Sequence, residues 1–91
     1  MTKQEFVDAV ADKAGMTKRD AGSAVDAALD VIEGTLRNGD AITFTGFGKF
    51  HVTRRAARQG VNPRTGEPVQ IAAANVPKFS AGSQLKKAVN S

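Results

Sequence analysis

The chain has 91 residues, no cysteine, one histidine, and 13 basic against 9 acidic side chains, for a net charge of +4. This length fits one small domain, and the lack of cysteine excludes a disulfide framework, thiolate zinc sites and a thiol nucleophile. The apolar runs are too short to span a membrane, and the N-terminus lacks the pattern of a signal or transit peptide. We expect neither a metal nor another cofactor, and no enzyme, because no acid–base pair or nucleophile stands out.

The charge is divided unequally along the chain. Residues 1–48 carry 5 basic and 8 acidic side chains, whereas residues 49–91 carry 8 basic side chains and a single acid, Glu67. The net charges of the two halves are therefore −3 and +7. A basic half of this kind predicts a polyanionic partner. An ordinary solvated basic surface would give the same count, so this alternative stays open from charge alone.

The first 39 residues predict two helices. Thr2 and Glu5 have the spacing of a capping box, and Gly15 can end the first helix in a left-handed conformation. Thr17 begins the second helix, and Asn38-Gly39 ends it. The second helix carries a long apolar stripe, made of Ala21, Ala24, Val25, Ala28, Leu29, Ile32 and Leu36.

An alternating pattern replaces the helical period after Gly39. Residues 41–44 and 47–53 predict two strands joined by a turn at Thr45-Gly46, and residues 68–74 predict another strand. Residues 80–91 predict a capped short helix. Within 47–53 the alternation separates an apolar face from a polar one. The polar face holds Lys49, His51 and Thr53, and His51 is interpreted there as an ordinary surface residue without a role.

The segment 54–66 is the most informative part of the chain. It holds four arginines and no acid, and Asn62-Pro63-Arg64-Thr65-Gly66 has the composition of a turn. The simplest construction extends both flanking strands as a two-stranded ribbon, the arm, over about residues 53–75 and roughly 33 Å long. An isolated ribbon is marginal in water, so we expect a mobile arm. Unless a bulge intervenes, Arg54 and Arg58 lie on one face and Arg55 on the other.

Without the arm, about 70 residues remain to form a core, which is fewer than usually give a stable one. Self-association, with two chains sharing one core, would solve this shortage. The apolar side chains expected in such a dimer core are Leu29, Ile32, Leu36, Phe44, Phe47, Phe50 and Phe79.

The whole sequence resembles the HU/IHF family of small bacterial histone-like proteins that bend DNA. The resemblance rests on Gly46-Phe47-Gly48-Lys49-Phe50, Arg55, Arg58, Gly60, Asn62-Pro63, Thr65-Gly66, the run Ala72 to Pro77, Phe79 and Gly82. It implies an α+β fold in an intertwined dimer. Residues 1–39 would form the helical dimerisation base, residues 40–79 a three-stranded antiparallel sheet with the protruding arm, and residues 80–91 the C-terminal helix.

The resemblance also assigns residues to a DNA interface. Family members are known minor-groove binders that insert apolar wedges, and Pro63 matches the wedge at the arm tip. The other implied DNA-binding residues are Lys3, Gly46, Arg54, Arg55, Arg58, Asn62, Arg64, Thr65 and Lys86. Three positions depart from the common family pattern, because Val61, Glu67 and Ser83 stand where a basic residue is frequent. These departures put the affinity and the length of the bound site in doubt.

We therefore expect a homodimer in the cytoplasm, at the bacterial nucleoid, that bends and compacts double-stranded DNA without sequence specificity. Bent, nicked or flexible DNA should be preferred, since a prepaid kink lowers the deformation cost. RNA stays open as a partner. One rival hypothesis is a sequence-selective IHF-like subunit that needs an unlike partner chain. Another is a protein-interaction module that uses the amphipathic helices.

Overall fold

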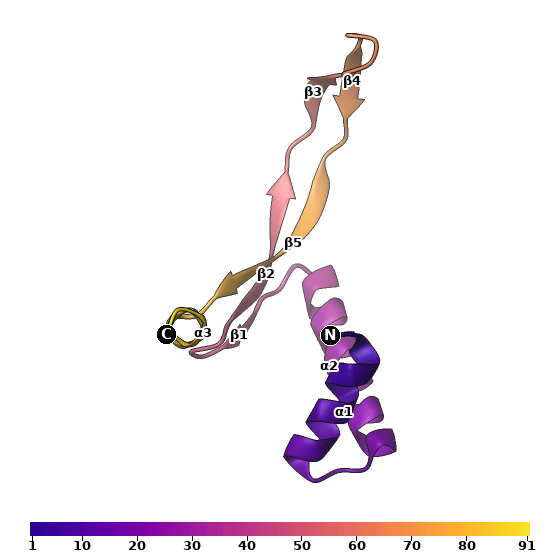
Figure 1. The fold of residues 1–91 in the computed structure, drawn as a ribbon. Helices are drawn as coiled ribbons and strands as arrows, with labels where there is room; N and C mark the ends of the chain where they lie inside the picture. The colour runs from indigo at the N-terminus through magenta and orange to yellow at the C-terminus, as the bar shows by residue number, and fades with distance from the viewer. The chain divides into compact units, whose positions relative to one another are not determined.

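The computed structural model describes residues 1–91, whose packing divides into two units, residues 1–34 and 35–91. Figure 1 shows the helices and strands in chain order. They are α1 (Lys3–Ala14), α2 (Lys18–Arg37), β1 (Ile42–Phe44), β2 (Gly48–Arg55), β3 (Arg58–Val61), β4 (Pro68–Ile71), β5 (Ala74–Ala81) and α3 (Ser83–Val89). None of these helices is long and apolar enough to cross a bilayer.

The first unit begins with the predicted capping box. The Glu5 amide donates to Thr2 Oγ1 at 3.2 Å, and the Thr2 amide donates to Glu5 Oε1 at 3.2 Å. Gly15 ends α1 with φ at 68°, and the Asp20 amide donates to Thr17 Oγ1 at 3.1 Å at the start of α2. The helix limits predicted from sequence are therefore confirmed by the groups that satisfy the free amides of each first turn.

The core of the first unit is small. Its buried side chains are Val7, Ala11, Ala21 and Val25. Valine is the largest of them, and no side chain larger than this is fully buried anywhere in the chain. The apolar stripe of α2 is thus only partly covered within one chain, and Leu29 keeps 49% of its surface exposed.

The second unit contains an antiparallel sheet in the order β1-β2-β5. β1 and β2 form a hairpin whose turn contains Gly46, with φ at 83°. Glycine suits this turn because it adopts the left-handed conformation without steric cost. β2 pairs along its whole length with β5, and this pairing places Phe50 opposite Phe79. The predicted three-stranded sheet is confirmed.

Two predicted boundaries are wrong. The strand expected over residues 68–74 is two strands, because β4 ends at Ile71 and β5 runs from Ala74 to Ala81. The C-terminal helix starts at Ser83 and not at residue 80, and its N-cap Gly82 makes no side-chain capping bond. Ser80 and Ala81 instead pair with Lys49 and Gly48. Strand pairing with β2 therefore overrides the local helix propensity of these residues.

Candidate nucleic-acid interface

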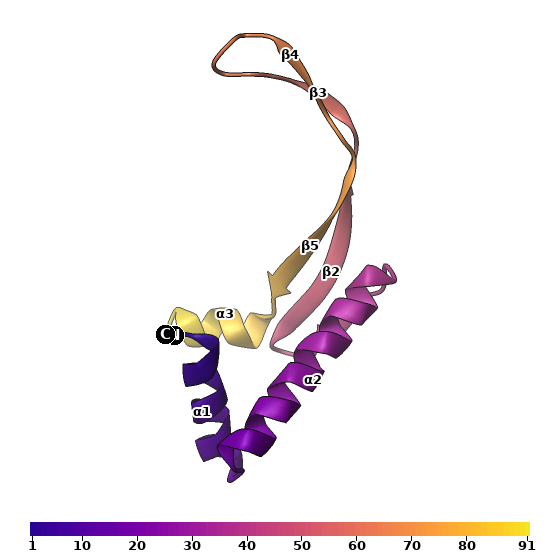
Figure 2. The same ribbon diagram turned by 90° about the vertical axis from the view of Figure 1, so that its right-hand side faces the viewer.

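The arm consists of two ladders that share one register. β2 pairs with β5 as far as Arg55 opposite Ala74, and β3 pairs with β4 from Arg58 opposite Ile71. Two residues on each strand separate the ladders, so no residue is inserted and the alternation of faces continues through the gap. Figure 2 shows that the paired strands curve along their length toward the tip. The predicted ribbon exists, but its hydrogen-bonded ladder is interrupted midway.

The tip is a turn held by backbone and side-chain hydrogen bonds. Asn62 Oδ1 accepts from the Arg64 amide at 2.9 Å, and the Asn62 carbonyl accepts from the Gly66 amide at 2.8 Å. The Asn62 amide donates to the Glu67 carbonyl at 2.8 Å, which closes the loop. Pro63 lies within this turn and is exposed. The turn therefore presents a rigid apolar ring to solvent at the end of the arm.

Thr65 also shapes the tip, since its Oγ1 accepts from the Glu67 amide at 3.3 Å. Gly66, next to it, has φ at 72°, a conformation that disfavours other residues. The polar tip residues thus have a structural role whether or not they touch a ligand.

The four arm arginines are all exposed, namely Arg54, Arg55, Arg58 and Arg64. Arg54 Nη1 donates to Asn75 Oδ1 at 3.2 Å, and Arg55 Nη2 donates to the Ala72 carbonyl at 3.3 Å. These neutral acceptors orient the guanidinium groups and leave their charge uncompensated. No arm arginine makes an ion pair. The arm therefore offers four charges to an anion.

Gly46 and Lys86 belong to one local arrangement in the second unit. The Leu85 amide, in the first turn of α3, donates to the Gly46 carbonyl at 3.2 Å. A methyl group at Gly46 would come within 2.6 Å of Gln84 Oε1. The hairpin turn thus packs against the start of α3, and a side chain at Gly46 would displace Gln84 and strain the left-handed backbone. Lys86 is an exposed residue of α3, and this helix lies at the end of the sheet away from the arm tip (Figure 1).

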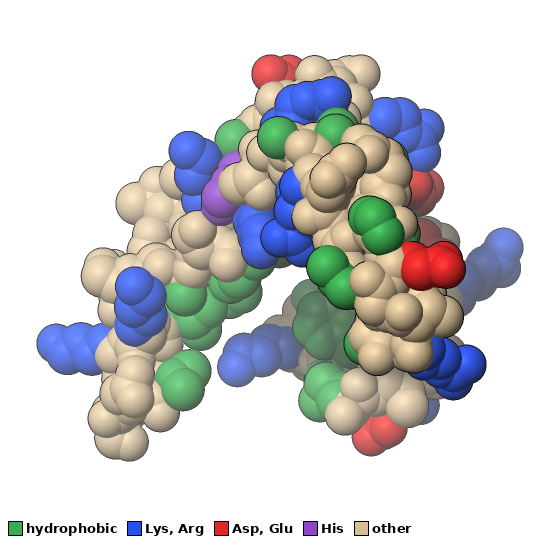
Figure 3. All heavy atoms as spheres, turned by 90° about the horizontal axis from the view of Figure 1, so that it is seen from above, with side chains coloured by type: hydrophobic (Ala, Val, Ile, Leu, Met, Phe, Trp, Pro, Cys, Tyr) green, Lys and Arg blue, Asp and Glu red, His purple; other side chains and the backbone are tan.

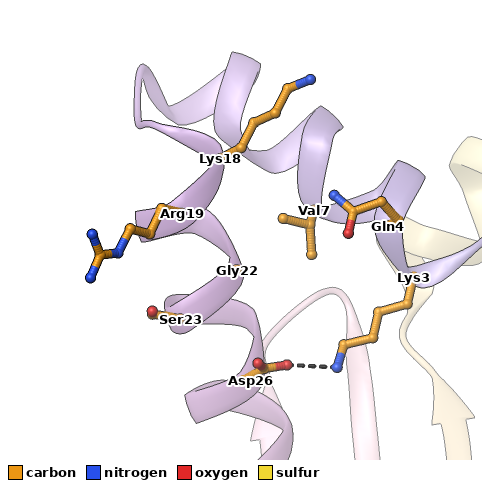
Figure 4. Close-up of a pocket in the computed structure, with 8 residues that line it drawn as sticks. All are labelled: Lys3, Gln4, Val7, Lys18, Arg19, Gly22, Ser23 and Asp26. Atoms are coloured by element: carbon orange, nitrogen blue, oxygen red, sulfur yellow. Dashed lines mark ion pairs between the residues drawn. The ribbon is translucent and has the colours of Figure 1, made fainter.

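Lys3 has a partner that the sequence prediction missed. Its Nζ lies 2.6 Å from Asp26 Oδ1, across a groove between α1 and α2 (Figure 4). The hydrogen bond and the charge of Asp26 raise the pKa of Lys3 above 10.5. A raised folded-state pKa means that this ion pair stabilises the fold below pH 10.5 and is lost only as the pH rises past the raised value. At neutral pH the lysine is charged, but its charge is compensated.

The sheet has one apolar face and one basic face. Strand pairing places the side chains of Phe44, Phe50 and Phe79 on the apolar face. The opposite face, called here the polar sheet face, contains Thr43, Lys49, His51, Thr53, Arg55, Ala74, Val76, Lys78 and Ser80. It holds no acidic side chain of the sheet. The basic residues Lys49 and Lys78 were absent from the predicted interface, although the period-two alternation already placed Lys49 on a polar face.

The phenylalanines of the apolar face contact one another but are poorly covered. Phe50 and Phe79 have ring centroids 4.8 Å apart, and Phe47 lies 5.8 Å from Phe79. Even so, Phe44, Phe47 and Phe79 keep 45%, 52% and 43% of their surfaces exposed. Ile32, Leu36 and Phe50 are half-buried. Within one chain, the predicted dimer-core residues of each unit are therefore exposed or only half-buried.

Three helices, a three-stranded antiparallel sheet and an uncompensated basic ribbon define a class of DNA-binding protein that uses β-ribbon arms. The sequence profile described as "Bacterial DNA-binding protein" matches residues 1–90. The chain belongs to this family, among its histone-like HU/IHF members.

Known proteins are similar to this chain along almost its full length. DNA-binding protein HRL18 of Rhizobium leguminosarum is 58% identical over 91 residues, which is 100% of both chains. DNA-binding protein HU of Geobacillus stearothermophilus is 51% identical over 89 residues, 98% of this chain and 99% of that one. In the cocrystal structure of Anabaena HU with DNA, the HU chain has a TM-score of 0.91 and 46% identity, covering 98% of this chain and 97% of that chain. The α+β fold inferred from the resemblance is confirmed.

Proposed function

We propose that this protein is an architectural DNA-binding protein that binds double-stranded DNA without sequence specificity, and bends and compacts it. The observation that carries this proposal is the exposed, uncompensated basic arm on a chain whose fold matches an HU protein cocrystallised with DNA. Guanidinium groups keep their charge and suit the narrow minor groove. That groove distinguishes little beyond A·T from G·C, so its readout favours shape over sequence.

In this proposal the tip acts as a wedge. Pro63 has no amide hydrogen, so it can enter a base step without an unsatisfied donor. The unstacking cost of a few kcal/mol is offset by the phosphate contacts that a bent duplex allows. Arg58 and Arg64 are the free arm cations, whereas Arg54 and Arg55 are held in place by neutral acceptors. Lys86 and Gly46 would meet the flanking DNA, and Lys3 would first have to leave or share Asp26.

The functional unit in this proposal is a homodimer. Figure 3, which looks onto the chain from above, shows apolar side chains open to solvent beside the projecting basic ones. The exposed Leu29 and the three exposed phenylalanines of the second unit need a partner surface. A second copy would supply this surface.

No observation favours an unlike partner chain, a protein-interaction role or RNA as the ligand, and none points to an enzyme. Membership of the family supports a place in the cytoplasm, at the bacterial nucleoid.

The testing experiment is a binding series with intact, nicked and bulged duplexes of random sequence at two salt concentrations. We expect tighter binding to nicked and bulged DNA, and a logarithmic affinity that falls by about 0.9 per logarithmic unit of salt for each phosphate neutralised. The same duplexes made of RNA serve as competitors. A salt-independent affinity, or equal affinity for nicked and intact duplex, would contradict the proposal.

A further inference from the structure

His51 lies in the middle of the basic polar sheet face. It stands directly opposite Lys78 on β5, and Lys49 and Thr53 flank it along β2. Ser80 is opposite Lys49, and β1 adds only Thr43 to this face. The charged groups around His51 are thus Lys49 and Lys78, with Arg55 further along the same face. No acid lies there to compensate them.

The imidazole is also held in a fixed position. His51 Nε2 lies 2.9 Å from Ser80 Oγ, across the β2–β5 pair. The ring is half-buried, whereas Lys49, Lys78 and Ser80 are exposed. When the imidazole is protonated, Nε2–H donates to the serine oxygen, and Nδ1–H remains as a second donor. The serine therefore orients the ring while one charged donor stays available to an anion.

We propose that His51 is a proton-dependent contact to a phosphodiester of bound DNA. This inference rests on the proposed function and adds to it a dependence on pH. Histidine is the side chain whose charge ordinarily changes between pH 5 and 8. A phosphate placed against this face favours the charged form of the imidazole, so DNA binding takes up protons.

The expected result follows from this linkage. Affinity for a duplex should rise roughly threefold to tenfold between pH 8 and pH 6 at constant ionic strength, because a charge-assisted hydrogen bond forms in each protomer. The salt dependence should steepen by up to about 1.8 in logarithmic slope, for two further phosphates per dimer. With one histidine per chain, up to two protons should be taken up per dimer.

The experiment measures fluorescence anisotropy of a labelled duplex at pH 6 and pH 8 with the unaltered protein, His51→Gln and Ser80→Ala. Calorimetric titration in two buffers of different ionisation enthalpy counts the protons. His51→Gln should bind at pH 8 like the unaltered protein and lose most of the gain at pH 6. Ser80→Ala should keep proton uptake but show a smaller gain, because the ring is less well oriented.

The design separates this inference from the proposed function. The other titratable groups of the chain are unchanged in His51→Gln, so their contribution cancels in the comparison. If His51→Gln shows the same gain and proton uptake as the unaltered protein, the inference is wrong and the proposed function stands. If no variant binds the duplex at either pH, the proposed function fails as well. Thermal unfolding of each variant checks that the fold is intact.

Discussion

The wedge role of Pro63 separates bending from binding. Pro63 is exposed, and the hydrogen bonds of the tip turn come from its neighbours, so Pro63→Ala should leave the turn intact. We expect the bend of a duplex labelled at both ends, measured by energy transfer, to decrease strongly. Affinity for pre-nicked DNA should change less than about threefold. The nick already removes the unstacking cost of a few kcal/mol per base step, so the proline is not needed there to open the step.

Pro68→Ala is the matched control for this change. Pro68 is an exposed proline of the same arm, paired with Val61 in the ladder and outside the tip turn. The Pro68→Ala variant should bend the duplex like the unaltered protein. An equal loss of bending in both variants would show that the arm needs proline for stiffness, and would remove the wedge from the mechanism.

Glycines in the two units should respond in opposite ways to alanine. A methyl group at Gly48 would overlap the Phe79 ring and lie 2.8 Å from the Ser80 carbonyl. Gly48→Ala should therefore lower the free energy of unfolding by about 1–3 kcal/mol. A methyl group at Gly22 in α2 would meet Val7 Cγ1 at 3.8 Å, an ordinary contact distance. Gly22→Ala should therefore raise the free energy of unfolding by about 0.5–1 kcal/mol. Denaturant unfolding of both variants measures the two effects, and a stabilising Gly48→Ala would refute the close approach.

At the level of elements, the helix limits were predictable because local groups decide them. Thr2, Glu5 and Gly15 satisfy the ends of α1 without help from distant parts of the chain. The end of β5 and the start of α3 were not predictable. The sequence around Ser80 is typical of a helix start, but in the structure Ser80 pairs with Lys49 across the sheet. The Lys3–Asp26 ion pair was missed for the same reason, since it joins two helices whose packing no local pattern describes.

The interrupted arm predicts a gradient of stability along the ribbon. The β2–β5 ladder adjoins the sheet, whereas the β3–β4 ladder is joined to it only through two unpaired residues on each strand. A free two-stranded ribbon is marginal in water. Amides of Arg58–Val61 should therefore exchange with deuterium faster than those of Gly48–Thr53 in the free protein, and should slow on addition of DNA. Equal protection of both ladders without DNA would contradict a mobile outer arm.

The arm charges should appear individually in the salt dependence. Arg58 is a free cation without a protein partner, so Arg58→Gln should lower affinity for all sequences alike. The logarithmic salt slope should fall by about 0.9 for each phosphate that the variant no longer neutralises. Gln59→Ala, the exposed neutral neighbour on the same strand, is the control and should leave the slope unchanged. An unchanged slope in Arg58→Gln would mean that this arginine is only a solvated charge.

For the whole molecule, the fold was predictable from the family pattern. The proposal of a dimer has a physical basis, which both the sequence and the structure support. Composition indicated too small a core once the arm was set aside. The structure shows the same small core. Its buried side chains are no larger than valine, whereas Phe47 keeps 52% of its surface exposed.

The proposed dimer leads to a prediction about exposed residues. If the chain acted alone, truncating a half-exposed phenylalanine would cost little. In a dimer that buries this ring, Phe47→Ala should lower the free energy of unfolding by about 3–5 kcal/mol. Val61→Ala is the control, because Val61 is 68% exposed at the arm and outside any shared core. This variant should change the free energy of unfolding by less than about 0.5 kcal/mol.

The midpoint of thermal unfolding should rise with protein concentration for the unaltered chain, since association is coupled to folding. A midpoint independent of concentration, together with a small effect of Phe47→Ala, would establish a folded monomer and leave the arms without the paired geometry that bending requires.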